Sequence, residues 1–282
     1  MRFLTRIDIF VFFRYHIKLM LWFLCFGFSN PVSAELVLSA PPREAEQAGV
    51  KLYGPLATHL SQLLGEKVSY EHPKNWLQYQ RDLRRGRYDI VFDGPHFISW
   101  RQEHLKHEVL VKLPGALEFV VAVDNGDTIQ SVKELVGKKV CGIPPPNLAT
   151  LTVIDLFKNP VRQPVIWGVP GGFKKVLLAF EAKQCRAAVF RTNFYMKLPK
   201  HKREKMRVLY KSSPLPNQGI SVSTKVSNEN KKRIIRSLTV GEGKVAARKI
   251  SSRFAGDKSF VAARKEDYSL YNLLLEGVVY GW

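Results

Sequence analysis

The chain has 282 residues, of which 45% are hydrophobic and 24% are charged, so it is long enough for one large domain or two ordinary ones and has a globular composition. That composition excludes an intrinsically disordered chain, a collagen-like fibre and a polytopic membrane protein. Lysine and arginine number 44 against 24 acidic residues, and the formal net charge of +20 favours an acidic partner such as a small anion, nucleic acid or anionic lipid.

The first 34 residues have the pattern of a secretory signal peptide. Basic residues within 1–18 precede an uncharged run over 19–28, and Val32, Ser33 and Ala34 supply a small-x-small end. The apolar run is shorter than the roughly 20 residues that span a bilayer. An uncleaved N-terminal anchor is the alternative, because the basic segment is itself rich in apolar residues. We expect residues 35–282 to be exported to the periplasm after the leader is cleaved.

Export changes which acidic partner the positive charge favours. The leader contributes three of the twenty net charges, which leaves about 17 on residues 35–282. Outside the cytoplasm we expect no nucleic acid partner, and a small anionic solute or the anionic membrane surface fits better. Much of the charge is also typical of a solvated surface, as in the basic runs at 200–205 and 231–233.

Strands and helices alternate from residue 35 onward. The predicted strands of the first half are 35–39, 68–70, 88–92 and 108–112, and its predicted helices are 48–64, 76–85 and 96–107. Gly65 and Gly86 follow two of these helices, as is typical of a helix C-terminus. The alternation predicts a parallel sheet covered by helices on both faces.

The same pattern restarts after residue 123. The predicted strands are 117–123, 139–143, 165–167, 187–190, 207–211 and 219–225, and the predicted helices are 131–136, 148–157, 173–182, 228–238 and 244–252. The strand at 117–123 leaves the first half and the strand at 219–225 returns to it. We therefore expect lobe 1 to comprise 35–120 plus 219–282 and lobe 2 to comprise 121–218, with the ligand in the crevice between them.

Residues 35–282 contain two cysteines, Cys141 and Cys185. An even number of cysteines in an oxidising compartment favours a disulfide, and both residues lie at or near the start of a predicted strand. Two buried free thiols are the alternative. The absence of CxxC and CxxxxC spacings excludes a thiol-redox site and a zinc ribbon.

Four stretches, taken in order, carry a family resemblance. They are 52–57 with 60–65, 83–89 with 93–95, 210–216 with 226–235, and 254–256 with 266–268. Together they resemble the periplasmic solute-binding proteins of ABC importers with the type II fold, above all the phosphate/phosphite/phosphonate-binding family. The resemblance spans nearly all of 35–282. It implies an α/β fold of two lobes, each a mostly parallel sheet flanked by helices, with two hinge strands that let the lobes close on a solute for an ABC permease.

The candidate ligand-binding residues lie where predicted strands end or helices begin. They are Ser39, Trp76, Asp93, Gly94 and His96 in lobe 1, and Asn147, Thr150, Arg191 and Thr192 in lobe 2. Trp76 matches the ligand-contacting aromatic of the family, and Arg191 suits a bidentate pair with a carboxylate, sulfonate or phosphonate. Each of these side chains also has a purely structural alternative. The hydroxyls and Asp93 could belong to a turn or a helix cap, and Trp76 could lie in the core. His96 could hydrogen-bond within its own turn, and Arg191 could be an ordinary surface charge.

Lobe 2 departs from the family pattern at two places. The family has a Ser-Thr-Ser run at a helix start, where this chain has Asn147, Leu148 and Ala149 before Thr150. An acidic residue of the family is replaced by Phe173 or Lys174. The chemical class of the solute therefore stays open between a phosphonate-like anion and another anionic or zwitterionic compound.

Sequence motifs of enzymes are absent. The chain has no GxSxG, HExxH or Walker glycine loop, and the pair His104 and His107 does not by itself make a complete metal site. We therefore expect no catalysis, no cofactor and no metal, and a monomer whose partners are a small-molecule ligand and an ABC permease. The alternatives are a periplasmic sensory protein that signals to a membrane partner, and an enzyme that uses the same cleft.

Overall fold

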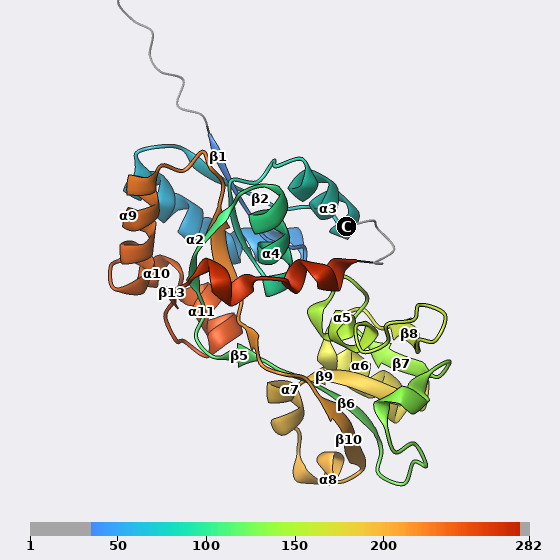
Figure 1. Ribbon diagram of the computed structural model, residues 1–282. Coiled ribbons are helices and arrows are strands. Elements are labelled where there is room, and N and C mark those ends of the chain that lie inside the picture. Colours follow the sequence, from blue (N-terminus) through green and yellow to red (C-terminus); the bar gives the residue numbers. More distant parts are fainter. Residues whose placement is uncertain (1–34, 277–282) are drawn as a thin grey trace, which may run out of the picture. The chain divides into compact units, whose positions relative to one another are not determined.

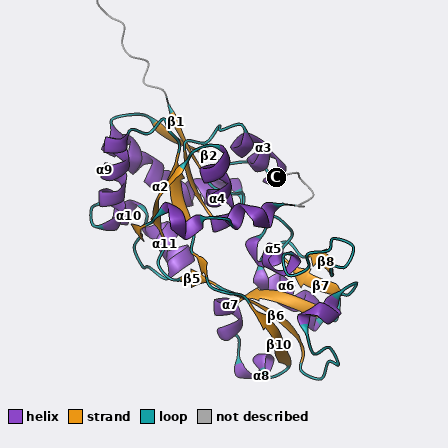
Figure 2. Cartoon of the chain, viewed as in Figure 1, coloured by secondary structure: helices purple, strands orange, loops and turns teal. Residues whose placement is uncertain are grey.

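The computed structural model describes residues 35–276 (Figure 1). The predicted leader lies outside the described residues. Strands and helices alternate along the described chain, as the sequence pattern predicts (Figure 2). None of the helices within 35–276 is long and apolar enough to cross a membrane.

Within residues 35–276, one sheet has six strands in the order β13-β4-β12-β3-β1-β2. Its strands are β1 (Leu36–Ser39), β2 (Val68–Glu71), β3 (Ile90–Asp93), β4 (Glu108–Lys112), β12 (Gly219–Val222) and β13 (Val261–Ala262). The helices of this lobe 1 are α2 (Glu46–Leu64), α3 (Trp76–Arg84), α4 (Pro95–His104), α9 (Asn228–Thr239), α10 (Gly243–Ala246) and α11 (Arg248–Ala255). The predicted helix at 244–252 is therefore two short helices, α10 and α11.

Helix α2 illustrates how the apolar period produces this packing. Leu52, Leu56 and Leu60 follow one another at fourfold spacing and are buried in the core beside β1 and β3. The helix ends at Gly65, whose φ of 70° lets its N–H bond the carbonyl of Ser61.

The second sheet of the described chain has five strands in the order β10-β6-β9-β7-β8. Its strands are β6 (Phe119–Asp124), β7 (Lys139–Gly142), β8 (Val165–Gly168), β9 (Ala187–Arg191) and β10 (Met206–Lys211). The helices of this lobe 2 are η1 (Val132–Leu135), α5 (Leu148–Ile154), α6 (Phe173–Glu181), α7 (Thr192–Met196) and α8 (Lys200–Arg203). A disulfide joins Cys141 in β7 to Cys185, just before β9, with their Cα atoms 5.6 Å apart.

Most strands of each sheet point in one direction, as predicted, but both sheets also contain antiparallel neighbours. The parallel pairs are β1 with β2 and β3, and β7 with β8 and β9. The strands that arrive from the other lobe, β12 and β6, insert antiparallel next to β3 and β9. Each sheet therefore consists of a parallel βαβ half and an antiparallel half, a difference that the order of elements alone does not reveal.

The chain crosses between the sheets twice, and the two crossings pair with each other. Strands β5 (Ala116–Leu117) and β11 (Leu215–Pro216) are antiparallel, with Leu117 opposite Leu215. The predicted strand at 117–123 is therefore divided, because β5 pairs with β11 whereas β6 pairs with β9 and β10. The boundaries predicted at 120 and 218 stay a prediction.

The last described elements are η2 (Lys265–Tyr268) and η3 (Tyr271–Leu275). Leu275 of η3 is fully buried in an apolar cluster that contains Phe97 and Trp100 of α4 and Leu151 of α5. This C-terminal cluster therefore joins residues of both lobes through an element other than the two crossing strands.

A buried ion pair joins the last turn of α4 to the end of β3. The two outer nitrogens of Arg101 each donate to a different oxygen of Asp93 at 2.7 Å, and the Tyr79 hydroxyl donates to the same carboxylate at 2.5 Å. Nε of Arg101 also donates to Ser221 Oγ in β12 at 3.1 Å. Asp93 and Arg101 are 0% and 1% exposed, so their charges are compensated by each other rather than by water.

Candidate functional site

A cavity of about 600 Å³ lies among loops that follow strands of both lobes. This cleft cavity is lined by Pro42, Arg43, Trp76, Gly94, His96, Phe97, Leu117, Phe119, Ile143, Pro144, Pro146, Asn147, Leu148, residues 170–173, Arg191, Gln218, Arg253 and Phe254. Most of these residues follow the carboxyl ends of β1, β3, β7, β8 and β9, which is where α/β sheets bind ligands.

The charged residues of this lining are all positive. Among the described residues that line it, Arg43, Arg191 and Arg253 are arginines and none is an Asp or Glu. Arg253 is compensated by Glu44, which lies outside the lining at 2.7 Å. Arg43 and Arg191 have no ion-pair partner within the described part of the chain. The cavity is therefore an electropositive site with two uncompensated cations.

Both of these arginines have a buried nitrogen that makes no hydrogen bond, which favours the binding of an anion. Nη1 of Arg43 and Nε of Arg191 are buried and have no hydrogen-bond partner. Burial also lowers the pKa of Arg191, because the desolvated guanidinium is disfavoured. An unpaired buried cation and its unsatisfied donors cost free energy, which an anionic ligand would recover.

Phe254 lies between two of the arginines. The guanidinium carbon of Arg43 is 5.8 Å from the centre of the Phe254 ring, and that of Arg253 is 5.4 Å away. Both distances are within the range of a cation–π contact. The ring of Phe254 therefore positions the two charges without neutralising them.

His96 connects the β3–α4 turn of lobe 1 to the β7–α5 turn of lobe 2. Its Nε2 lies 3.1 Å from the carbonyl oxygen of Pro146, and because a carbonyl can only accept, Nε2 carries the proton. Nδ1 is then an acceptor, and it is buried without a partner. Gly94 leaves room for this ring, since a Cβ there would lie 3.0 Å from His96 Cε1.

Burial lowers the pKa of His96 to about 3, chiefly because the imidazolium loses its hydration. The unfolded chain has the ordinary pKa of about 6.5, so between these values it binds a proton that the folded protein does not. The stabilisation is complete above about pH 6.5 and is lost on acidification. Between pH 7 and 5 we expect His96 to lower the free energy of unfolding by about 2 kcal/mol.

Urea unfolding at pH 7 and pH 5 measures this loss. His96→Gln should lose less stability on acidification than the unmodified chain does. The exposed His201→Gln is the matched control and should behave as the unmodified chain does. An equal loss in all three proteins would show that His96 is not the group responsible.

The start of α6 supplies backbone donors to the cavity wall. Gly171 and Gly172 have φ values of 92° and 86°, a region that favours glycine, and Gly172 is the N-cap. No side chain caps this helix, and the first bonded N–H groups of its N-terminus belong to Lys175 and Val176. The amides of Phe173 and Lys174 therefore add to the partial positive charge at this end.

Five of the predicted site residues line the cleft cavity. These are Trp76, Gly94, His96, Asn147 and Arg191. The side chain of Asn147 also caps α5, because its Oδ1 accepts from the N–H of Ala149. The rule that ligand-binding residues follow the carboxyl ends of strands accounts for four of them, whereas Trp76 was chosen because it matches an aromatic residue of the resembled family.

The other four do not line it. Ser39 Oγ donates to the carbonyl of Glu71, Thr150 Oγ1 donates to the carbonyl of Ile143, and Asp93 is held by Arg101. Thr192 Oγ1 is buried without a partner. The first three polar groups are used inside their own lobes, which is the turn or packing role given above as the alternative.

Sequence reasoning missed several lining residues. Arg43 stands just beyond the Pro41-Pro42 turn after β1, and the adjacent Gly171 and Gly172 precede a helix, so both positions carried a usable signal. No local sequence signal marks Gln218, Arg253 and Phe254 as lining residues, because only the tertiary fold brings β12 and α11 to this cavity.

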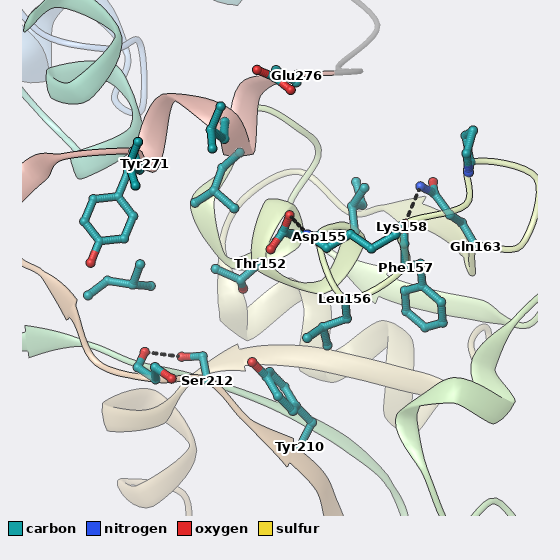
Figure 3. Close-up of a pocket in the computed structure, with 17 residues that line it drawn as sticks. Thr152, Asp155, Leu156, Phe157, Lys158, Gln163, Tyr210, Ser212, Tyr271 and Glu276 are labelled. Carbon is teal, nitrogen blue, oxygen red and sulfur yellow. Dashed lines mark hydrogen bonds and ion pairs between the residues drawn. The ribbon is translucent and has the colours of Figure 1, made fainter. Parts of the chain in front are cut away.

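A second cavity, of about 690 Å³, has a different chemistry (Figure 3). It lies between η3, the end of α5 and β10, and its lining includes Asp155 and Glu276. The ammonium of Lys158 is 2.9 Å from Asp155 and is thus already compensated. This cavity offers an anion no free cation among its described residues. Likewise, within 35–276 no group of His, Cys, Asp and Glu has the arrangement of a metal site.

Three solved structures share the fold. PhnD1 from Prochlorococcus marinus, in complex with methylphosphonate, is 10% identical, covers 85% of this chain and 96% of its own, and has a TM-score of 0.63. A binding component of an ABC phosphonate transporter from Pseudomonas aeruginosa is 14% identical, with coverages of 84% and 83% and a TM-score of 0.57. A Xanthomonas citri protein bound to ATP is 14% identical, with coverages of 87% and 100% and a TM-score of 0.67. These likenesses confirm the type II periplasmic binding protein fold.

No curated protein matches the sequence. The model of a protein family, described as the periplasmic substrate-binding protein of the ABC phosphonate transporter, matches residues 38–268. Its members are substrate-binding proteins of transport rather than enzymes, and they are periplasmic. Because the match covers most of the sequence, this chain belongs to the family of periplasmic substrate-binding proteins of ABC phosphonate transporters.

Proposed function

We propose that this chain binds a small anionic, phosphonate-like solute in the cleft cavity and delivers it to an ABC permease. The observation that carries the proposal is the presence of Arg43 and Arg191 in a lining without a described carboxylate. Both have a buried donor without a partner. A planar guanidinium matches the oxygens of a phosphonate or carboxylate with two parallel hydrogen bonds.

The two chain crossings would let the lobes open and close, so that a solute can enter and leave the cleft. Strands β5 and β11 are the two chain crossings between the lobes, and they are short and paired only with each other. Rotation at such crossing segments is a standard means of closing two lobes around a ligand. This proposal also includes delivery to a permease, which the family supports, and export through a cleaved leader and a monomeric state, which are predictions from the sequence.

The site is tested with the full chain purified after export. Thermal unfolding is followed with phosphate, phosphite, methylphosphonate, sulfonates and amino acids, and a ligand at about 100 times its dissociation constant adds about 2.7 kcal/mol to stability. For an anion that binds, Arg191→Ala should weaken the affinity by about 10- to 100-fold, because a charge-assisted hydrogen-bonding partner is lost. The measurement is isothermal titration calorimetry.

Two controls separate binding from folding. Arg236→Ala removes an exposed arginine from α9 and should leave the affinity unchanged. Without a ligand, Arg191→Ala should be as stable as the unmodified chain or more so, because it removes a half-buried charge that has no ion-pair partner among the described residues. An anion that binds equally well to Arg191→Ala would contradict the assignment of Arg191.

A further inference from the structure

We infer that the solute carries its anionic group on an apolar body of about the size of an aromatic ring, and that inorganic phosphate and methylphosphonate are poor ligands. The inference rests on the proposed function, because it names the ligand class of the same cavity. Four features of the lining carry it: its volume, its apolar wall, the lack of hydroxyls among its described residues and the position of two of its arginines.

The volume is too large for a tetrahedral anion alone. The cleft cavity holds about 600 Å³. Cavities of about 300–1,000 Å³ accommodate drug-sized ligands and bury most of their surface. Methylphosphonate has only five non-hydrogen atoms, so it would leave most of this space to water or empty.

The wall of the cavity is apolar on both lobes. Lobe 1 contributes the half-buried Trp76 and Phe254, and lobe 2 contributes the half-buried Phe173 beside the core residue Phe119. Trp76 is itself stacked on Phe97, with ring centres 6.2 Å apart. Aromatic side chains that remain partly exposed in a cleft gain free energy when a second apolar or planar group covers them.

The lining lacks the hydroxyls that would surround a free phosphate on every side, since no described residue of it is a Ser, Thr or Tyr. Its donors are the arginines, the amides at the start of α6 and the side-chain amides of Asn147 and Gln218. His96 presents an acceptor, and Asn147 uses its oxygen to cap α5. An inorganic phosphate has oxygens on all four sides, and each oxygen that faces an apolar wall loses its hydration without a replacement. An anion with carbon on one side avoids this cost.

Two of the three arginines mark one end of the cavity. Arg191 and Arg253, together with Phe254, also line a neighbouring cavity of about 730 Å³, which contains Lys197, Lys258 and Glu118. Trp76 lies only in the cleft cavity. The anionic group therefore belongs at the Arg191 end, beside the basic neighbouring cavity, and the apolar body extends towards Trp76.

The experiment compares four anions on the full exported chain by isothermal titration calorimetry. Phenylphosphonate and phenyl phosphate carry a ring, whereas methylphosphonate and inorganic phosphate do not. We expect each ring-bearing probe to bind at least about tenfold more tightly than its small counterpart, since even one extra methylene in a pocket is worth about tenfold or more. The two ring-bearing probes distinguish a carbon–phosphorus compound from a phosphate ester.

Substitutions of two lining aromatics test where the ring of the ligand binds in the cleft cavity. Trp76→Ala and Phe173→Ala should each reduce the preference for phenylphosphonate over methylphosphonate by several-fold, which is a ratio that a general loss of folded protein does not change. Tyr271→Ala is the matched control, because Tyr271 lines the second cavity, and it should leave the ratio unchanged. The two aromatic variants lie on different lobes, so one remains informative if the other fails to fold.

The outcomes separate this inference from the proposed function. If methylphosphonate or phosphate binds as tightly as its ring-bearing counterpart and Arg191→Ala weakens it, the ligand class is wrong but the anion site stands. If none of the four anions binds and the neutral probe benzyl alcohol does, both are overturned.

Discussion

Replacing Arg101 with methionine is expected to lower the free energy of unfolding by about 3–5 kcal/mol, because it leaves the Asp93 carboxylate buried without its counter-charge. The two residues are 1% and 0% exposed and share two hydrogen bonds of 2.7 Å. Methionine retains most of the volume of the arginine stem, so the loss of the charge rather than of packing dominates. Urea unfolding followed by tryptophan fluorescence measures the change.

The double variant Arg101→Met with Asp93→Asn tests this cause. An asparagine at 93 is neutral and can still accept from the Tyr79 hydroxyl, so the double variant should recover part of the stability that the single variant loses. Arg248→Met, an exposed arginine at the start of α11, is the matched control and should change stability little. A double variant that is less stable than Arg101→Met would contradict the charge argument.

The second large effect is expected from the disulfide. Cys141 and Cys185 are 44 residues apart. A cross-link that closes a loop of that length lowers the conformational entropy of the unfolded chain, and this stabilises the folded protein by about 4 kcal/mol. Replacing both cysteines with alanine should therefore lower the midpoint of thermal unfolding by about 8–16 °C.

A reductant provides the control for this prediction. Dithiothreitol should lower the midpoint of the unmodified protein towards that of the double alanine variant, and it should leave the variant itself unchanged. An unmodified protein whose midpoint is insensitive to reductant under unfolding conditions would show that the bridge does not stabilise it.

The local elements of the fold were predictable because their causes are local. The apolar period of α2 and the glycine that ends it are visible in the sequence, and the helix lies within two residues of its predicted bounds. The direction of β12 and β6 in their sheets was not predictable, because each pairs with a strand that is distant in the sequence, and the position at which the chain re-enters a sheet is not visible in the sequence. The short pairing of β5 with β11 was missed for the same reason.

The candidate site was predictable to the extent that chain position decides it. Gly94, His96 and Asn147 line the cavity because they follow strands, and that can be read from the sequence. Ser39 and Thr150 also follow strands, but a neighbouring backbone carbonyl takes each hydroxyl. Whether a polar side chain points to a ligand or to its own turn depends on which unsatisfied carbonyl is within reach, and the sequence does not show this.

The C-terminal cluster of Leu275, Phe97, Trp100 and Leu151 bears on how tightly the cleft retains any solute. Packed interiors do not deform continuously, so a rotation about β5 and β11 must exchange this packing for another. The population of the binding-competent conformation, and with it the apparent affinity, then depends on the packing of Leu275, which does not line the cleft cavity. A substitution at Leu275 would thus change how strongly the cleft retains its solute without changing the residues that recognise it.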